Sequence, residues 1–158
     1  IDEITKNLST SNINNPNFQS SLLKSGYNLF SKPTTYMNNS GLAVHAIKEY
    51  YKIGLENIIV IHDDLDLPFG TVKFKIGGGH GGHNGLRSLD AHITKEYIRV
   101  RIGIGKPQDK SDVANYVLSN FSKEEINRLQ DIITHTIKAI EALKAEDIDQ
   151  VKSKFTLK

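Results

Sequence analysis

Residues 57–89 read NIIVIHDDLDLPFGTVKFKIGGGHGGHNGLRSL, and this stretch decides the fold class. It opens with the continuous apolar run Asn57–Ile61, which is typical of a strand buried on both faces in α/β proteins. A charged turn, His62–Asp66, follows directly, and Gly70–Ile76 then alternates like a second strand. After a run of glycines, Gly85–Ile93 has helical spacing. Two strands and a helix in this order indicate an α/β pattern.

The sequence on either side continues the alternation of strands and helices. Ser40 and Ser122 are placed to cap helices, the second in a capping box with Glu125. Tyr97–Ile104 alternates so that Arg99 and Arg101 share one face of a strand. Further strands are expected at 18–24 and 27–32, and helices at 1–8, 41–52, 109–118 and 123–145. The pattern predicts an α/β fold with a mainly parallel or mixed sheet.

Composition limits the possible functions. The chain has 158 residues, of which 38% are apolar and 24% charged, which suits one soluble globular domain. It has no cysteine, so disulfides, thiolate catalysis and cysteine-ligated metal sites are excluded. Residues 70–110 hold eight Lys and Arg against three Asp and Glu. A local basic field attracts phosphates, although an excess this small more often means a solvated face.

The glycine-rich run Gly77–Gly85 is the strongest sign of a functional site. Glycine permits positive φ and lets a ligand reach backbone N–H groups. The run follows a strand and opens a helix, whose N-terminus can face an anionic or polar group. It lacks the context of a dinucleotide fold and the Lys-Ser/Thr pair of a P-loop. A plain surface turn is the alternative, but the embedded His80, His83 and Asn84 favour a binding or catalytic site.

The segment His62–Asp66 is a second candidate. It follows a strand, at the edge where open α/β sheets bind ligands, and a carboxylate there can orient an imidazole or hold a cation. Asp64 and Asp66 are also typical of a turn in which carboxylates accept local N–H groups. A metal site with His80 and His83 would need converging ligands that spacing cannot establish, and we expect no metal and no cofactor.

A third segment, Lys32–Gly41, reads KPTTYMNNSG. Either Asn38 or Asn39 can donate to a substrate carbonyl or support the turn, and the spacing does not decide between these roles. Together with HDDLDLPFGTVKFKIGGGHGGHNGLRS and RVRIGIGKP, this block resembles the three signature blocks of the bacterial-type peptidyl-tRNA hydrolases. The blocks occur in the family's order, and the resemblance runs from about residue 1 to the C-terminal helices.

The resemblance implies a fold, an activity and a partner. The fold would be a single-domain, three-layer α/β sandwich over residues 1–158, with a mixed, mainly parallel sheet flanked by helices. The activity would be hydrolysis of the ester between peptide and tRNA in peptidyl-tRNA, which recycles tRNA from stalled translation. The protein would be a cytoplasmic monomer that needs no metal, does not bind membranes and binds the tRNA acceptor arm through a basic patch.

The resemblance also implies roles for individual residues. Asp63 would orient the catalytic histidine, and Asn84, beside His83 in the cleft, would hold the attacking water or the substrate. Segment 106–120 resembles the stretch that gates the cleft. The expected catalytic residues are Asp63, His83 and Asn84; the substrate-binding residues are Tyr36, Asn38, Gly81 and Gly82; the tRNA-binding residues are Lys75 and Arg101.

One family feature has no counterpart among the 158 residues. The family's general base is a histidine in an N-terminal segment, where it can deprotonate water near neutral pH. None of the six histidines replaces it by motif, and His45, His92 and His135 fall on helical stretches. We therefore expect the native protein to carry that segment before Ile1, and we do not expect residues 1–158 alone to supply the base.

A catalytically silent member of the same fold that binds tRNA or other RNA is the alternative function. The other alternative is an inactive truncated form of the enzyme. The presence of Asn38, Asp63 and Asn84 favours the enzyme.

Overall fold

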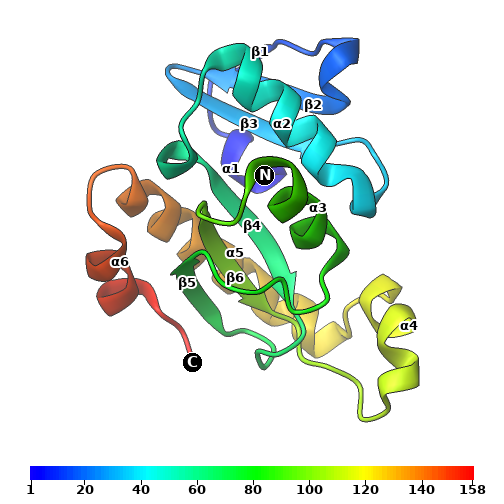
Figure 1. Ribbon diagram of the computed structural model, residues 1–158. Coiled ribbons are helices and arrows are strands. Elements are labelled where there is room, and N and C mark those ends of the chain that lie inside the picture. The colour runs from blue at the N-terminus through cyan, green and yellow to red at the C-terminus, as the bar shows by residue number, and fades with distance from the viewer. The chain divides into compact units, whose positions relative to one another are not determined.

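Strands and helices are interspersed along the computed structural model, which describes residues 1–158 and ends in three successive α-helices (Figure 1). The strands are β1 (Ser11–Asn12), β2 (Ser20–Ser25), β3 (Asn28–Pro33), β4 (Ile59–Asp64), β5 (Val72–Ile76) and β6 (Ile98–Gly103). The α-helices are α1 (Asp2–Thr5), α2 (Ser40–Tyr51), α3 (Asn84–Ile93), α4 (Val113–Leu118), α5 (Lys123–Leu143) and α6 (Ile148–Phe155). Short 3-10 helices are η1 (Pro16–Phe18), η2 (Met37–Asn39), η3 (Leu55–Asn57) and η4 (Lys110–Asp112).

Contacts divide the chain into two units. Unit 1 comprises Ile1–Ile58 and Ile76–Tyr97, and unit 2 comprises Ile59–Lys75 and Ile98–Lys158. One sheet has the order β1-β2-β3, and the other has the order β4-β6-β5. The single domain expected over residues 1–158 stays a prediction.

Unit 1 is built on an antiparallel hairpin. Strands β2 and β3 pair from Ser20 opposite Pro33 to Ser25 opposite Asn28, and the turn between them uses Gly26 at φ +59°. This confirms the two strands predicted at 18–24 and 27–32, each shifted by one or two residues. The core of the unit joins Phe18, Leu22 and Ile47, because α2 lies along the hairpin (Figure 1).

Helices α2 and α3 of unit 1 cross at a glycine. The Gly41 N–H donates to the Ser88 hydroxyl at 2.8 Å, and a Cβ at position 41 would lie 2.2 Å from the Ser88 carbonyl oxygen. The predicted cap at Ser40 is wrong. Helix η2 runs straight into α2, so Ser40 already has helical φ and ψ, and its hydroxyl donates to the Met37 carbonyl at 2.8 Å.

The sheet of unit 2 is mixed, as predicted, with one parallel and one antiparallel pairing. Strands β4 and β6 are parallel. At the other edge the Gly103 N–H donates to the Thr71 carbonyl at 2.8 Å, and the Gly70 N–H donates to the Gly103 carbonyl at 3.2 Å. This pattern, with Gly70 at φ +88°, is a glycine bulge that starts an antiparallel pairing. Strand β5 reverses direction because a short turn, and no crossover helix, joins it to β4.

Three other differences concern unit 2. The segment predicted as a charged turn begins inside β4, because pairing with β6 continues through His62, Asp63 and Asp64. The apolar residues of β4 are half-buried, where burial on both faces was predicted. Helix α6 was not predicted from the sequence. Its Val151 is fully buried, as are Val72 and Val100 of the sheet.

Helix α5 begins as predicted. The Glu125 N–H donates to the Ser122 hydroxyl, and the Ser122 N–H donates to the Glu125 carboxylate, so both halves of the capping box are present. Although α5 is the longest helix, neither it nor any other helix combines the length and apolar character that crossing a membrane requires.

Candidate active site

The glycine-rich run of unit 1 forms a hydrogen-bonded turn. The His83 N–H donates to the His80 carbonyl at 3.0 Å, and the two central residues, Gly81 and Gly82, have φ of +58° and +81°. Positive φ at both central positions is costly for residues with a Cβ, so the turn requires glycine. The His80 Nδ1 atom accepts from the Gly82 N–H at 3.0 Å, so the His80 ring stabilises the turn.

His83 is the N-cap of α3. Its Nδ1 atom accepts from the Gly85 N–H at 3.0 Å and from the Leu86 N–H at 3.2 Å, while its carbonyl accepts from the Arg87 N–H. An Nδ1 that accepts carries no proton, so the neutral ring has its proton on Nε2. The expectation that these N–H groups of the helix face a ligand is wrong, because His83 already occupies them.

Asn84 follows as the first residue of α3, and its side chain is exposed. Beside it, a Cβ at Gly85 would lie 2.8 Å from the Met37 Sδ atom and 2.9 Å from a ring carbon of His83. Glycine at 85 therefore lets η2 pack against the start of α3. This contact places Asn38, which lies on η2, near the glycine-rich turn. The segments Gly77–Gly85 and Lys32–Gly41 therefore come together within unit 1. The catalytic and substrate-binding roles of their residues stay predictions.

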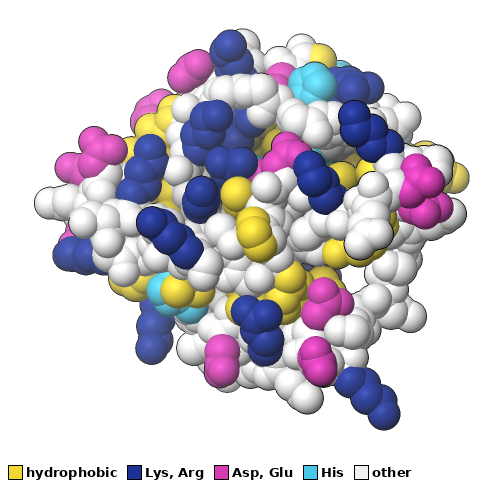
Figure 2. All heavy atoms as spheres, turned by 90° about the horizontal axis from the view of Figure 1, so that it is seen from below, with side chains coloured by type: hydrophobic (Ala, Val, Ile, Leu, Met, Phe, Trp, Pro, Cys, Tyr) yellow, Lys and Arg dark blue, Asp and Glu magenta, His cyan; other side chains and the backbone are white.

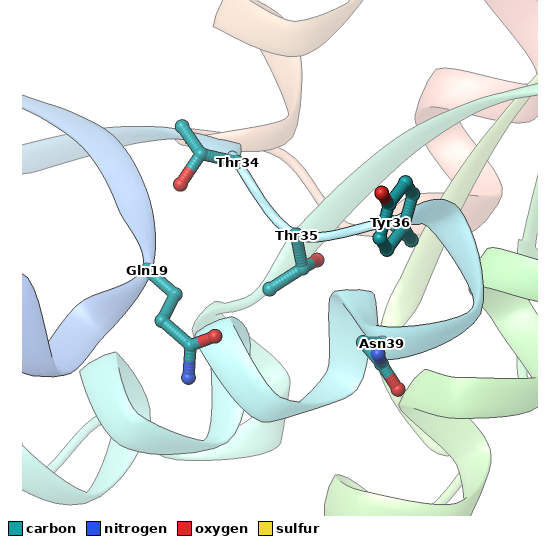
Figure 3. Close-up of a pocket in the computed structure, with 5 residues that line it drawn as sticks. All are labelled: Gln19, Thr34, Thr35, Tyr36 and Asn39. Carbon is teal, nitrogen blue, oxygen red and sulfur yellow. The ribbon is translucent and has the colours of Figure 1, made fainter.

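Tyr36 lines a polar hollow of about 520 Å³ in unit 1, together with neutral amides and hydroxyls (Figure 3). The other lining residues are Gln19, Thr34, Thr35 and Asn39. Gln19 has φ +49°, although it is not glycine, and its carbonyl accepts the Thr34 N–H at 2.8 Å. Sequence reasoning missed Gln19, since no motif marks a left-handed residue of this type.

Three predicted site residues lie in unit 2. Asp63 stands opposite Ile102 near the end of β4, Lys75 is half-buried on β5, and Arg101 lies on β6. The Arg101 Nε atom donates to the Asp64 carboxylate at 2.9 Å. Asp64 also accepts the Asp66 N–H at 2.9 Å, which confirms the predicted turn role of its carboxylate.

The predicted gating segment contains η4 and α4. The Tyr116 hydroxyl of α4 donates to the Ile104 carbonyl at 2.5 Å, which ties this helix to the end of β6. A Cβ at Gly105 would lie 3.2 Å from the same hydroxyl, so the glycine makes room for the contact. Sequence reasoning missed Tyr116. Its gating role stays a prediction.

The structure contains no cluster of side chains suited to a metal centre. No group of three or more His, Asp or Glu side chains could hold a metal ion. The pKa of Asp2 is lowered by its hydrogen bond to Lys32, and that of Asp109 by the Ser111 N–H, but neither is a predicted site residue. In Figure 2, Lys and Arg side chains mix with Asp and Glu on the face in view, so the basic patch stays a prediction.

The family model for peptidyl-tRNA hydrolase matches residues 1–158. The chain belongs to the peptidyl-tRNA hydrolase family. It is 84% identical to the peptidyl-tRNA hydrolase of Aliarcobacter butzleri over 158 residues, which are all of this chain and 86% of that protein. It is 48% identical to that of Campylobacter fetus over 159 residues, which cover 100% of this chain and 86% of that protein.

Solved structures of the family agree with the fold. The crystal structure of the peptidyl-tRNA hydrolase from Acinetobacter baumannii superposes with a TM-score of 0.91 at 31% identity, covering 98% of this chain and 81% of that one. The chain therefore has the α/β fold of the peptidyl-tRNA hydrolases, with a mixed sheet and helices. The family match over residues 1–158 lends no support to the expectation of a missing segment, and nothing in the comparisons supports the silent RNA-binding alternative.

Proposed function

We propose that this protein hydrolyses the ester bond between peptide and tRNA in peptidyl-tRNA, and so recycles tRNA from stalled translation. The 84% identity to a peptidyl-tRNA hydrolase along the whole chain carries the proposal. The packing of Met37 against Gly85 supports it, because it brings η2, which carries the exposed Asn38, to the start of α3, which carries the exposed Asn84.

The proposed roles follow from the chemistry of ester hydrolysis. A base must take a proton from water, and a polar group must stabilise the negative oxygen that develops on the ester carbon. The Asn84 amide holds the attacking water or the ester, and Asn38 contacts the peptide. Asp63 orients the histidine that acts as base. His83 stabilises the helix end that carries Asn84.

The tRNA part of the substrate is proposed to bind through its phosphates. Lys75 and Arg101 supply cations on adjacent strands of unit 2, and they are assigned to the phosphate at the tRNA 5′ end. Each phosphate contact releases condensed counterions, so removing one cation lowers the salt slope of binding by about one. Lys75→Ala and Arg101→Ala should each show this change. A monomer acting in the cytoplasm, where translation supplies the substrate, completes the proposal.

Release of an N-blocked amino acid from tRNA by the purified native protein tests the activity. Asn84→Ala should lower kcat by about 10²–10³, the usual effect of removing one group that stabilises an oxyanion. Asn127→Ala is the matched control, because Asn127 is an exposed asparagine on α5. If the wild-type protein binds tRNA tightly and releases nothing, the proposed activity is wrong.

A further inference from the structure

Asp64 and Arg101 form a partly buried ion pair in unit 2. The parallel register sets Arg101 opposite His62 and Asp64 opposite Gly103, so the two side chains are diagonal neighbours on one face of the sheet. The Arg101 Nε atom donates to the Asp64 Oδ2 atom at 2.9 Å, and the side chains are 25% and 13% exposed. Because the pair is partly buried, salt screens its attraction less than it screens a pair on the surface.

The Asp64 carboxylate is fixed independently of Arg101. Its other oxygen, Oδ1, accepts the Asp66 N–H at 2.9 Å, and the Asp64 carbonyl accepts the Ile104 N–H at 3.1 Å. Oδ1 and the backbone carbonyl of Asp64 are therefore held without Arg101, and Oδ2 is left to engage the guanidinium. A carboxylate fixed in this way can determine where the guanidinium lies, because Arg101 is the longer and more adaptable partner.

The geometry leaves Arg101 able to bind an anion. Asp64 engages the Nε atom, and a guanidinium carries further N–H donors on both Nη atoms, arranged as a fork that matches phosphate oxygens. On the adjacent strand β5, Thr71 faces Gly103, so Lys73 faces Arg101 two residues further along the antiparallel ladder. A second cation therefore borders the same position.

An acidic residue beside cations that bind phosphate needs an explanation, because its charge repels the ligand. Loss of Asp64 would strengthen the local positive field, yet it would also release a long side chain that must then be ordered when the phosphate binds. Ordering such a side chain costs binding free energy, and preorganisation removes that cost. Which effect is larger decides whether Asp64 helps or hinders the phosphate.

We propose that Asp64 is a positioning residue that holds the Arg101 guanidinium in the orientation that receives the 5′ phosphate of the tRNA. The inference rests on the proposed function, which assigns Arg101 to that phosphate. A fixed fork accepts a phosphate in one place, so Asp64 makes binding depend on the tRNA 5′ end. A mobile Arg101 would bind phosphates anywhere along an RNA chain.

Kinetics on two substrates test this role. Peptidyl-tRNA bearing a 5′ phosphate and the same substrate with a 5′ hydroxyl are compared for wild type, Asp64→Asn and Asp64→Glu, with Asp66→Asn as the control. Asp64→Asn should raise KM for the phosphorylated substrate about tenfold, the loss of one charge-assisted contact, and leave kcat unchanged. On the 5′-hydroxyl substrate its KM should equal that of the wild type.

Other outcomes overturn the proposal. A lower or unchanged KM for Asp64→Asn would mean that the carboxylate only repels phosphate. An equal rise in KM on both substrates would mean a structural role, which unfolding by urea would reveal. If Asp64→Asn does not fold, Asp64→Glu, which keeps the charge but shifts it, should raise KM only on the phosphorylated substrate. Failure of the proposed function is distinct, since the wild type would then release no peptide, and direct binding of both tRNAs would still test Asp64.

Discussion

Replacing His83 tests whether this residue acts only as the N-cap of α3 or also as a catalytic histidine. In the structure its Nδ1 atom accepts two N–H groups, from Gly85 and Leu86, and both of these residues are buried. Loss of an N-cap usually costs about 0.5–2 kcal/mol. Because the orphaned donors are shielded from water, we expect His83→Ala to cost about 1–2 kcal/mol, in the upper part of that range. Each kcal/mol lowers Tm by about 2–4 °C in a chain of this size.

His83→Asn is the decisive variant. Asparagine is among the best N-caps, so it should restore stability to within about 0.5 kcal/mol of the wild type. If His83 acts only through the cap, kcat/KM should then fall by less than about tenfold, whereas loss of a general acid or base costs about 10²–10⁴. Urea unfolding followed by circular dichroism gives the stability, and release of an N-blocked amino acid from tRNA gives the rate.

Asp147→Ala supplies the matched control for His83→Ala. The Asp147 side chain caps α6 by accepting the Gln150 N–H at 2.9 Å, so its removal should cost about 1 kcal/mol without lowering kcat/KM. A stable His83→Asn variant that loses a hundredfold or more in rate would refute the reasoning, because the cap would then be intact and the chemistry lost.

Three further predictions concern the turn, the N-terminal ion pair and the long helix. Gly82→Ala should lower the free energy of unfolding by about 1–2 kcal/mol, because φ at Gly82 is +81°. Gly79→Ala should be nearly neutral, because φ at Gly79 is not positive and nothing lies within 4 Å of the added Cβ. Urea unfolding of the two variants measures the difference. Lys32→Gln should raise the pKa of Asp2 toward 3.8, as measured by NMR titration. Because the ion pair lowers this pKa in the folded protein, any stabilisation of the fold by the pair is present above pH 3.8. It is lost as the pH falls through the pKa of Asp2 in the folded protein. An unchanged Asp2 titration would contradict the ion pair. Ser122→Ala should cost about 1 kcal/mol by removing the capping box of α5, and an unchanged urea midpoint would contradict that.

Local signals in the sequence predicted much of the secondary structure. The capping box at Ser122 and the helix after the glycines were found because their determinants lie within a few residues of one another. The predicted cap at Ser40 was wrong because residue type alone does not show where a helix begins. Ser40 looks like a cap by residue type, but the preceding turn is already helical, and no propensity at position 40 reports that.

Non-local pairing explains what the sequence could not predict. Strand β4 extends through Asp64 because β6, some 37 residues later, continues the ladder, so charged residues that resemble a turn stay in the sheet. The antiparallel pairing of β5 starts at a bulge at Gly70, which looks like an ordinary turn glycine in the sequence. The ion pair of Asp64 and Arg101 follows from that pairing and has no local signature.

The candidate site combines two demands that a single loop rarely meets. The start of α3 must remain capped, or its buried N–H groups lose their partners, and under the proposed function it must also present a polar group to the substrate. His83 satisfies the first demand by taking the N–H groups of Gly85 and Leu86. Because the N–H groups of Gly85 and Leu86 are bonded to His83, a side chain must supply the polar group for the substrate. We propose that the exposed amide of Asn84, the first residue beyond the cap, is that side chain.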